Sequence, residues 1–316
     1  MSHQPPPQTL WFTRCPVPTA TGIAADLGWL AGEFRPDGIE VRSLQDADRT
    51  EEAAHHFSHT LTNLFREGGN VPALWARARG QDTRLLGLTW IEERQAVLTR
   101  PEDTGRWREG RLAVPRRDIA IDFWRAMALK GFDGVLDLAT AERVEVKAGP
   151  EAPQWEAELR ALRDGEVDAV YVKGALAVEA AARFGAVVAL DLDALPDPRS
   201  RINNGTPRPI TVHQRLLDER PDLVIRFLTV LLRAADWAAA RPRELQRILA
   251  AETGAGSAAT ATAYAHQPLH PDLSDERLDL LAEQERFLFA HGFTDAPVDV
   301  RAWSDPAPLA AARQSL

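Results

Sequence analysis

Apolar residues along this chain recur at two spacings, one typical of short buried strands and the other of amphipathic helices. The first segments predict a strand over 10–13, a helix over 20–30 and, after the turn Pro36-Asp37-Gly38, a strand over 39–44. Together they form a βαβ unit. Later strands are expected at 83–91, 95–98, 144–147, 167–172, 186–190 and 210–212, and later helices at 72–79, 117–130, 155–163, 175–184, 221–240, 242–251 and 275–291.

This alternation of strands and helices predicts an α/β protein with two lobes and a helical C-terminal region. The polar stretch 100–115 and the Pro-rich stretch 196–209 are the expected crossings between the lobes. Lobe 1 then comprises 1–99 and 204–316, and lobe 2 is the central insert 100–203.

Regular patterning fades between Gln45 and Val71. The segment carries five acidic residues, three histidines and a Gly pair, and a connection of that length inside a compact domain is usually functional or mobile. Its few apolar anchors should let it open at a low cost in free energy. The fold resemblance described below implies a place at the mouth of the cleft, so we expect a mobile lid.

Composition excludes several functional classes. The net charge of −9 argues against a nucleic-acid partner, because phosphate binding needs a basic surface. One cysteine among 316 residues allows no internal disulfide, which fits a reducing compartment. Residues 1–8 lack the basic and apolar parts of a signal peptide, and no apolar run approaches the ~20 residues of a membrane span. A cytoplasmic protein with no membrane partner is expected.

The single cysteine, Cys15, follows the first predicted strand, which Pro16 and Pro18 end. In open α/β sheets ligands bind at the carboxyl ends of strands. A lone free cysteine is nevertheless more often an inert buried residue than a nucleophile. Position alone leaves both interpretations open.

A second candidate is Arg66-Glu67-Gly68-Gly69. Arg presents a planar fork of donors, and glycines let backbone amides approach an anion, so the stretch could hold an oxyanion. On spacing alone, a Gly-rich turn with a solvated Arg is the favoured interpretation. His55, His56 and His59 have spacing compatible with a metal, but no second Cys, no His-Glu-x-x-His pattern and no carboxylate pair accompanies them, so no metal is expected.

Several motifs taken together resemble known families. Type II periplasmic binding proteins of the sulfonate and thiamine-precursor branch are one such family. The chain resembles them in its two-lobe architecture and in the motif Arg220-Pro221-Asp222-Leu223-Val224. The chain also resembles the hydroxybiphenyl sulfinate desulfinase family of dibenzothiophene desulfurisation, through Cys15-Pro16-Val17-Pro18, His56-Phe57, Arg66-x-Gly68-Gly69-x-x-Pro72 and Thr83-Arg84-Leu85-Leu86-Gly87.

The resemblance implies a monomeric, cofactor-free enzyme that cleaves the C–S bond of a small aromatic sulfinate and releases sulfite, with its site in a central cleft. The catalytic residues implied are Cys15, His56 and Arg66, and the substrate-binding residues are Thr13, Arg14, Gly68, Gly69 and Trp124. His56 is expected to hydrogen-bond Cys15, and Trp124 to stack on the arene. Arg14 stands where the family has a neutral polar residue, so it could lower the thiol pKa or contact a second anionic group.

Two chemical routes stay open: attack of the thiolate on sulfur, or protonation of the ring carbon by the thiol. The alternative function is a non-catalytic solute-binding protein for sulfonates or thiamine precursors. A thiamine-pyrimidine biosynthetic enzyme on the same fold would need a different His/Cys signature, which is not found.

Overall fold

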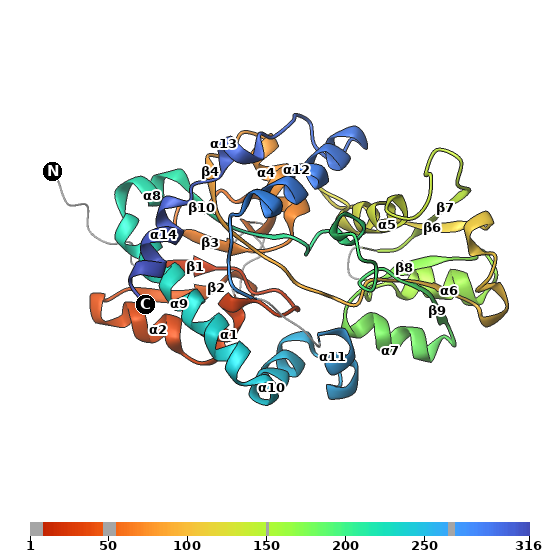
Figure 1. Ribbon diagram of the computed structural model, residues 1–316, viewed down its shortest axis with the longest axis horizontal. Helices are drawn as coiled ribbons and strands as arrows, with labels where there is room; N and C mark the ends of the chain where they lie inside the picture. Colours follow the sequence, from red (N-terminus) through yellow and green to blue (C-terminus); the bar gives the residue numbers. More distant parts are fainter. Residues whose placement is uncertain (1–8, 47–54, 150–151, 265–268) are drawn as a thin grey trace. The chain divides into compact units, whose positions relative to one another are not determined.

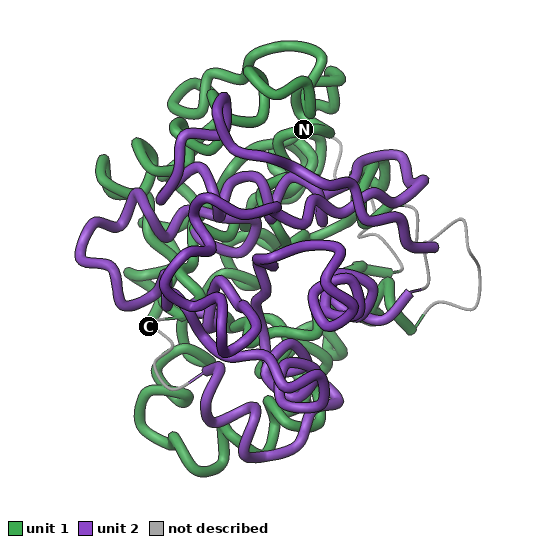
Figure 2. The backbone as a smooth tube through the Cα atoms, turned by 90° about the vertical axis from the view of Figure 1, so that its right-hand side faces the viewer, with its two compact units in different colours: residues 1–91, 207–252, 267–316 green, residues 92–206, 253–266 purple. Residues whose placement is uncertain are grey.

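The computed structural model describes residues 9–46, 55–149, 152–264 and 269–316 (Figure 1). The chain forms two compact units, coloured separately in Figure 2. Unit 1 comprises Met1–Ile91, Pro207–Glu252 and Gln267–Leu316, and unit 2 comprises Glu92–Thr206 and Thr253–His266.

Unit 1 is built on a five-stranded sheet of order β2-β1-β3-β10-β4. Its strands are β1 (Thr9–Phe12), β2 (Glu40–Ser43), β3 (Leu64–Glu67), β4 (Thr83–Thr89) and β10 (Arg208–His213). β1 is parallel to β2 and β3, whereas β10 is antiparallel to β3 and β4. Because β10 alone is reversed, its first residue lies at the same sheet edge as the carboxyl ends of β1, β3 and β4.

Unit 1 also contains helices, several of which cover this sheet (Figure 1). They are α1 (Ala20–Asp26), α2 (Trp29–Phe34), α4 (Asn70–Ala78), α8 (Gln214–Glu219), α9 (Pro221–Ala240), α10 (Pro242–Thr253), α12 (Asp275–Ala290), α13 (Val300–Trp303) and α14 (Ala307–Gln314). The longest, α9, packs against α1, α2 and α14. Its Phe227 ring stacks on Phe65 of β3 with centroids 3.8 Å apart, which anchors the helix to the middle of the sheet.

Unit 2 contains a three-stranded sheet, β8-β5-β9, and a parallel pair, β6 and β7. The strands are β5 (Ala96–Thr99), β6 (Leu112–Arg116), β7 (Arg143–Lys147), β8 (Val170–Val172) and β9 (Val187–Asp191). The helices are α5 (Phe123–Asp133), α6 (Glu156–Arg163), α7 (Ala175–Arg183) and α11 (Ser257–Ala263). β8 and β9 are both antiparallel to β5, which separates them. The alternation of elements predicts a parallel arrangement, which is wrong for this sheet, because β5 pairs antiparallel with both of its neighbours.

Buried ion pairs and aromatic rings fill the core of unit 2. The Arg117 and Glu158 side chains, each 1% exposed, form a salt bridge of 2.8 Å. Trp155 is fully buried, and its indole N–H donates to the carbonyl oxygen of Lys173, whose ammonium pairs with Glu93 at 2.8 Å. Each of these buried charges therefore has an opposite charge beside it, as burial requires.

Most predicted elements are confirmed, and α9 has the predicted bounds. The helix expected over 20–30 is divided into α1 and α2, because Gly28 adopts a left-handed conformation with φ 71°. The helix expected from 117 begins at Phe123, where the Asp122 carboxylate accepts a hydrogen bond from the Arg125 amide as its N-cap. Local capping chemistry set these boundaries.

The units differ from the expected lobes at residues 92–99, 204–206 and 253–266, which belong to unit 2. The strand expected at 95–98 falls within the expected lobe 1, but β5 pairs with β8 and β9 in unit 2. Residues 253–266 also belong to unit 2, where α11 packs against α7. Both placements depend on contacts with residues far away in sequence.

The expected lid over 45–71 is not uniformly irregular, because it contains β3, a strand buried at all four positions. Strands buried on both faces lack the polar–apolar alternation that identifies a surface strand, and β3 also carries two charged residues. Residues 47–54, the most acidic part of the expected lid, lie outside the described residues.

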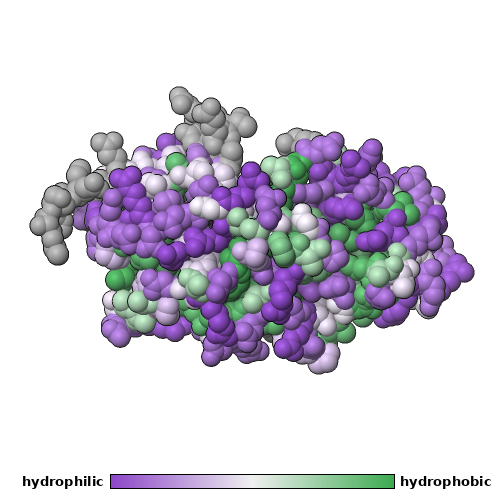
Figure 3. Space-filling model, turned by 90° about the horizontal axis from the view of Figure 1, so that it is seen from above, coloured by the Kyte–Doolittle hydropathy of each residue, from purple (hydrophilic) through white to green (hydrophobic). Residues whose placement is uncertain are grey.

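Figure 3 shows hydrophilic side chains spread over one face of the molecule, with hydrophobic residues in small groups between them. Among the described residues, no helix combines the length and apolarity needed to span a bilayer.

Gly131 offers a test of this packing. A Cβ at Gly131 of α5 would lie 2.2 Å from the Tyr171 ring, whereas one at Gly105 would meet no atom within 4 Å. Gly131→Ala should therefore lower the free energy of unfolding by about 1–3 kcal/mol, as overpacking does. Gly105→Ala is the control, with a near-neutral effect in urea titration. Equal stability of the two variants would contradict the close approach of α5 to β8.

Candidate active site

Cys15 lies three residues beyond the end of β1, at the edge where the carboxyl ends of β1 and β3 meet. The Thr13 amide donates to the Phe65 carbonyl at 3.1 Å, and the Thr13 hydroxyl donates to the Glu67 carbonyl at 2.9 Å. The Cys15 thiol also points at the Glu67 carbonyl, with 3.8 Å between sulfur and oxygen. Thr13 and Cys15 are thereby held against β3, and Cys15 is only 8% exposed.

Arg66 lies on β3 and is fully buried, so the solvated-turn interpretation is wrong. Its Nε donates to the His56 carbonyl at 2.8 Å, and its Nη2 donates to the Gly69 carbonyl at 3.1 Å. Its Nη1 is buried with no hydrogen-bond partner among the described residues. Since a buried donor without a partner costs free energy, this nitrogen is suited to receiving a ligand.

The charge around Arg66 is unbalanced. Burial lowers the pKa of Arg66 to about 10; the Cys15 thiolate opposes this effect and Arg208 adds to it. In the described part of the chain, no carboxylate forms an ion pair with Arg66. A buried cation held only by carbonyl oxygens favours the binding of an anion.

The nearby Glu67 does not supply that anion. Its carboxylate accepts hydrogen bonds from the Thr21 amide at 2.9 Å, the Thr21 hydroxyl at 2.6 Å and the Thr89 hydroxyl at 3.1 Å. Glu67 therefore ties α1 and β4 to the central strand, and the hydrogen bonds of Arg66 go to carbonyl groups.

The two glycines have different roles from those expected. The Gly68 amide donates to the Pro209 carbonyl at 3.2 Å, so it is already occupied. Instead, Gly68 leaves space for Arg66, because a Cβ there would lie 2.8 Å from Cζ and Nη1 of the guanidinium. Gly69 is the N-cap of α4, and its carbonyl holds Arg66.

The half-buried His56 and the buried His59 are both neutral at ordinary pH, because their pKa values are lowered to about 3. Burial lowers the pKa of His56 to about 3, with further lowering by Arg66 and Arg208. The His56 Nδ1 lies 3.5 Å from Gln45 Nε2, and its carbonyl, not its ring, contacts Arg66. The expected hydrogen bond between His56 and Cys15 is not present among the contacts of the described residues. The described residues also contain no cluster of three potential metal ligands.

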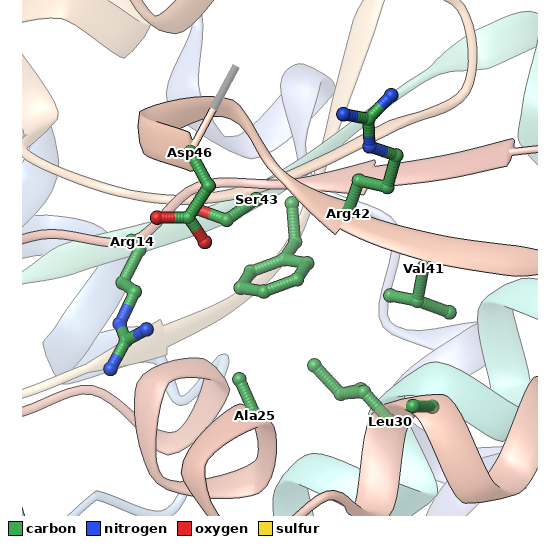
Figure 4. A pocket seen from close by; sticks show the side chains of 9 residues that line it. Arg14, Ala25, Leu30, Val41, Arg42, Ser43 and Asp46 are labelled. Atoms are coloured by element: carbon green, nitrogen blue, oxygen red, sulfur yellow. The ribbon is translucent and has the colours of Figure 1, made fainter. Parts of the chain in front are cut away.

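Arg14 is engaged in an ion pair. Its Nη2 lies 2.6 Å from the Glu252 carboxylate, and its amide donates to the Gln45 side chain. Its side chain lines a pocket of about 290 Å³ together with Asp46 and Arg42, as Figure 4 shows. Arg14 is not among the charges that act on the Cys15 thiol. The structure therefore gives no support to the alternative in which Arg14 lowers the thiol pKa.

Trp124 belongs to unit 2 and lies on α5. The Arg117 guanidinium lies over its ring, 5.1 Å from the centroid, and Trp155 meets it edge-on with centroids 5.0 Å apart. The residue is only half-buried, so part of it is accessible to a ligand.

Arg208 is the site residue that sequence reasoning missed. It is 3% exposed, and it lowers the pKa of the Cys15 thiol through its charge and through a side-chain hydrogen bond. Burial raises the pKa of Cys15 above its ordinary value, while Arg208 and Arg66 oppose that rise. The signal available in the sequence was an Arg between Pro207 and Pro209 at the start of a buried strand.

The chain has relatives of known activity, although no family model matches it. It is 28% identical over 352 residues to the 2'-hydroxybiphenyl-2-sulfinate desulfinase of Rhodococcus erythropolis, covering 94% of this chain and 92% of that protein, with the same values for the Rhodococcus qingshengii protein. The resemblance expected from the motifs is confirmed.

Solved structures support the fold. A cysteine-to-serine variant of the enzyme DSZB in complex with biphenyl-2-sulfinic acid matches with a TM-score of 0.74 and 22% identity, covering 98% of this chain and 99% of that one. The periplasmic aliphatic sulphonate binding protein SsuA of Escherichia coli matches with a TM-score of 0.70 and 14% identity, covering 95% and 93%. The expected fold class, α/β and similar to type II periplasmic binding proteins, is confirmed.

His59 makes the stability of unit 1 depend on pH. It is 1% exposed, and burial followed by Arg66 lowers its pKa from 6.5 to about 3, with His213 adding to the effect. Between these values the unfolded chain binds more protons, so the free energy of unfolding should fall as pH drops from 6.5 towards 3. His59→Gln should reduce that slope by up to ~1.4 kcal/mol per pH unit in denaturant titrations. Identical slopes for wild type and His59→Gln would contradict the burial of a neutral imidazole.

Proposed function

We propose that this protein cleaves the C–S bond of a small aromatic sulfinate and releases sulfite. The observation that carries the proposal is the buried Arg66 guanidinium, with one unpartnered nitrogen among the described residues, in the same cluster as the only cysteine of the chain. Similarity to the Rhodococcus desulfinases supports the reaction and the substrate class.

A sulfinate fits the charge of this cluster. Its two oxygens carry one negative charge, and a guanidinium can donate to such a group through two N–H bonds. Nη1 of Arg66 is the donor that remains available, since Nε and Nη2 already hold carbonyl groups. The anion would supply the charge that Arg66 lacks among the described residues.

The state of the thiol favours one of the two routes. Because burial raises the pKa of Cys15, the group is a thiol at neutral pH and can act as a proton donor. The electron pair of the C–S bond stays on the ring carbon, which takes the proton from Sγ as sulfur dioxide leaves. Hydration of sulfur dioxide yields bisulfite and a proton that restores the thiol. Arg66 and Arg208 stabilise the thiolate formed in between.

Other residues have supporting roles in this proposal. Thr13 holds the loop of Cys15 to β3, and the His56 carbonyl holds Arg66. The accessible part of the Trp124 ring offers an aromatic surface that suits an arene. Arg14, which pairs with Glu252, would act on substrate only by leaving that pair. A cytoplasmic monomer completes the proposal, because a reducing compartment keeps a single thiol free.

The second candidate is a binding protein for sulfonates, which the fold shared with SsuA favours. Such a protein would hold the anion without breaking its C–S bond. Incubation with a panel of arylsulfinates and arylsulfonates separates the two functions, because binding without sulfite release supports only the second.

The first prediction on activity concerns Cys15. Cys15→Ser should abolish sulfite release from arylsulfinates, because a hydroxyl is a far weaker acid than a thiol, while calorimetry still detects sulfinate binding. Retention of more than about a tenth of the wild-type rate, equivalent to ~1.4 kcal/mol in the barrier, would exclude Cys15 as the reacting group.

The second prediction on activity concerns the space that Gly68 leaves for the Arg66 guanidinium. Gly68→Ala should displace the Arg66 guanidinium and reduce kcat/KM by well over tenfold, as should Arg66→Lys, which loses the planar fork. Gly32→Ala is the matched control, since a Cβ there meets no atom within 4 Å. Near-normal kcat/KM in both Gly68→Ala and Arg66→Lys would remove Arg66 from the anion site.

A further inference from the structure

Arg208 lies at a fixed position beside the loop that follows β3. It is the first residue of β10 and pairs in register with Thr89, the last residue of β4. On one side of it, the Pro207 carbonyl accepts a hydrogen bond from the Asn70 side chain at 2.9 Å. On the other side, the Pro209 carbonyl accepts one from the Gly68 amide at 3.2 Å. These two hydrogen bonds fix the backbone on both sides of Arg208.

Two buried guanidinium groups meet at this edge of the sheet. Arg66 is fully buried and Arg208 is 3% exposed, and each acts electrostatically on Cys15. They also repel each other, since Arg208 disfavours the charged form of Arg66. Like charges at low dielectric are costly unless an anion lies between them, so their placement around one thiol points to an anionic ligand.

We propose that Arg208 is the second guanidinium of the anion site, donating to a sulfinate oxygen together with Arg66 and stabilising the Cys15 thiolate through its hydrogen bond. The sulfinate part of this inference rests on the proposed function. Arg208 then contacts both the substrate and the reacting sulfur, and it performs the task expected of His56.

The thiolate role can be tested without any substrate. Because the chain has one cysteine, the rate of its reaction with methyl methanethiosulfonate at pH 8 reports the thiolate fraction of Cys15, with Cys15→Ser as the blank. Arg208→Gln should react at least fivefold more slowly than wild type, and Arg208→Lys, which keeps the charge, within twofold of it. An unchanged rate in folded Arg208→Gln would overturn the thiolate role.

The matched control is Arg84→Gln. Arg84 is on β4 of the same sheet, but it pairs in register with Val212, away from the edge that holds Arg208. Its removal takes away the same charge from the sheet and should leave the thiol rate within twofold of wild type. A slowing equal to that of Arg208→Gln would mean that total charge, and not the contact with Cys15, sets the rate.

The substrate role is measured by protection of Cys15 with benzenesulfinate. Arg208→Lys loses the planar fork, so the benzenesulfinate concentration that halves the thiol reaction should rise at least fivefold. Protection within twofold of wild type would overturn the sulfinate contact. This measurement also decides the inference if Arg208→Gln does not fold, as judged by circular dichroism.

The outcomes separate this inference from the proposed function. If the wild type releases no sulfite from any arylsulfinate, the proposed reaction fails, while the thiol rates still decide whether Arg208 acts on Cys15. If the wild type is active and the thiol rate of Arg208→Gln is unchanged, the reaction stands and the thiolate role of Arg208 fails.

Discussion

The site depends on the burial of one cation. Arg66 lies in the central strand of the unit 1 sheet with no exposed surface, held by the carbonyl oxygens of His56 and Gly69. Its remaining nitrogen has no partner among the described residues. Burying a charge costs free energy, and neighbouring carbonyl dipoles reduce this cost. A bound anion can reduce it further. The neighbouring backbone is shaped around this group, since Gly68 has no side chain where the guanidinium lies.

Sheet topology explains how the other groups reach Arg66. Cys15 follows the carboxyl end of β1, and Arg66 lies near the carboxyl end of β3. Arg208 is the first residue of β10, which runs in the opposite direction. These three residues are far apart in sequence but lie at one edge of one sheet. Glu67 fixes this edge through hydrogen bonds to Thr21 and Thr89, so the cations keep their positions without pairing with it.

The same features distinguish a reactive site from a simple anion-binding site. An anion-binding site needs only donors, whereas proton transfer needs an acid whose conjugate base is stabilised. Burial keeps Cys15 protonated, and the two guanidinium groups favour its thiolate once the proton has left. The proposed cleavage of a C–S bond depends on this balance of burial and positive charge.

Local sequence determined much of the framework. The first βαβ unit, the long helix α9 and the position of Cys15 after β1 follow from apolar spacing and from proline and glycine signals, which act over a few residues. The motif around Arg66 and the resemblance to the desulfinase family were also evident from residue types and spacing.

The tertiary structure decided what neighbours each group has. Arg66 lies in a buried strand and not in a turn, and the Gly68 amide donates its hydrogen bond to the Pro209 carbonyl. The tertiary structure also paired Arg14 with Glu252 and brought Arg208 to the thiol. Burial, ion pairing and pKa depend on atoms that are close in space, and strand order, which brings residues 15, 66 and 208 together, is a non-local property that no spacing along the chain encodes.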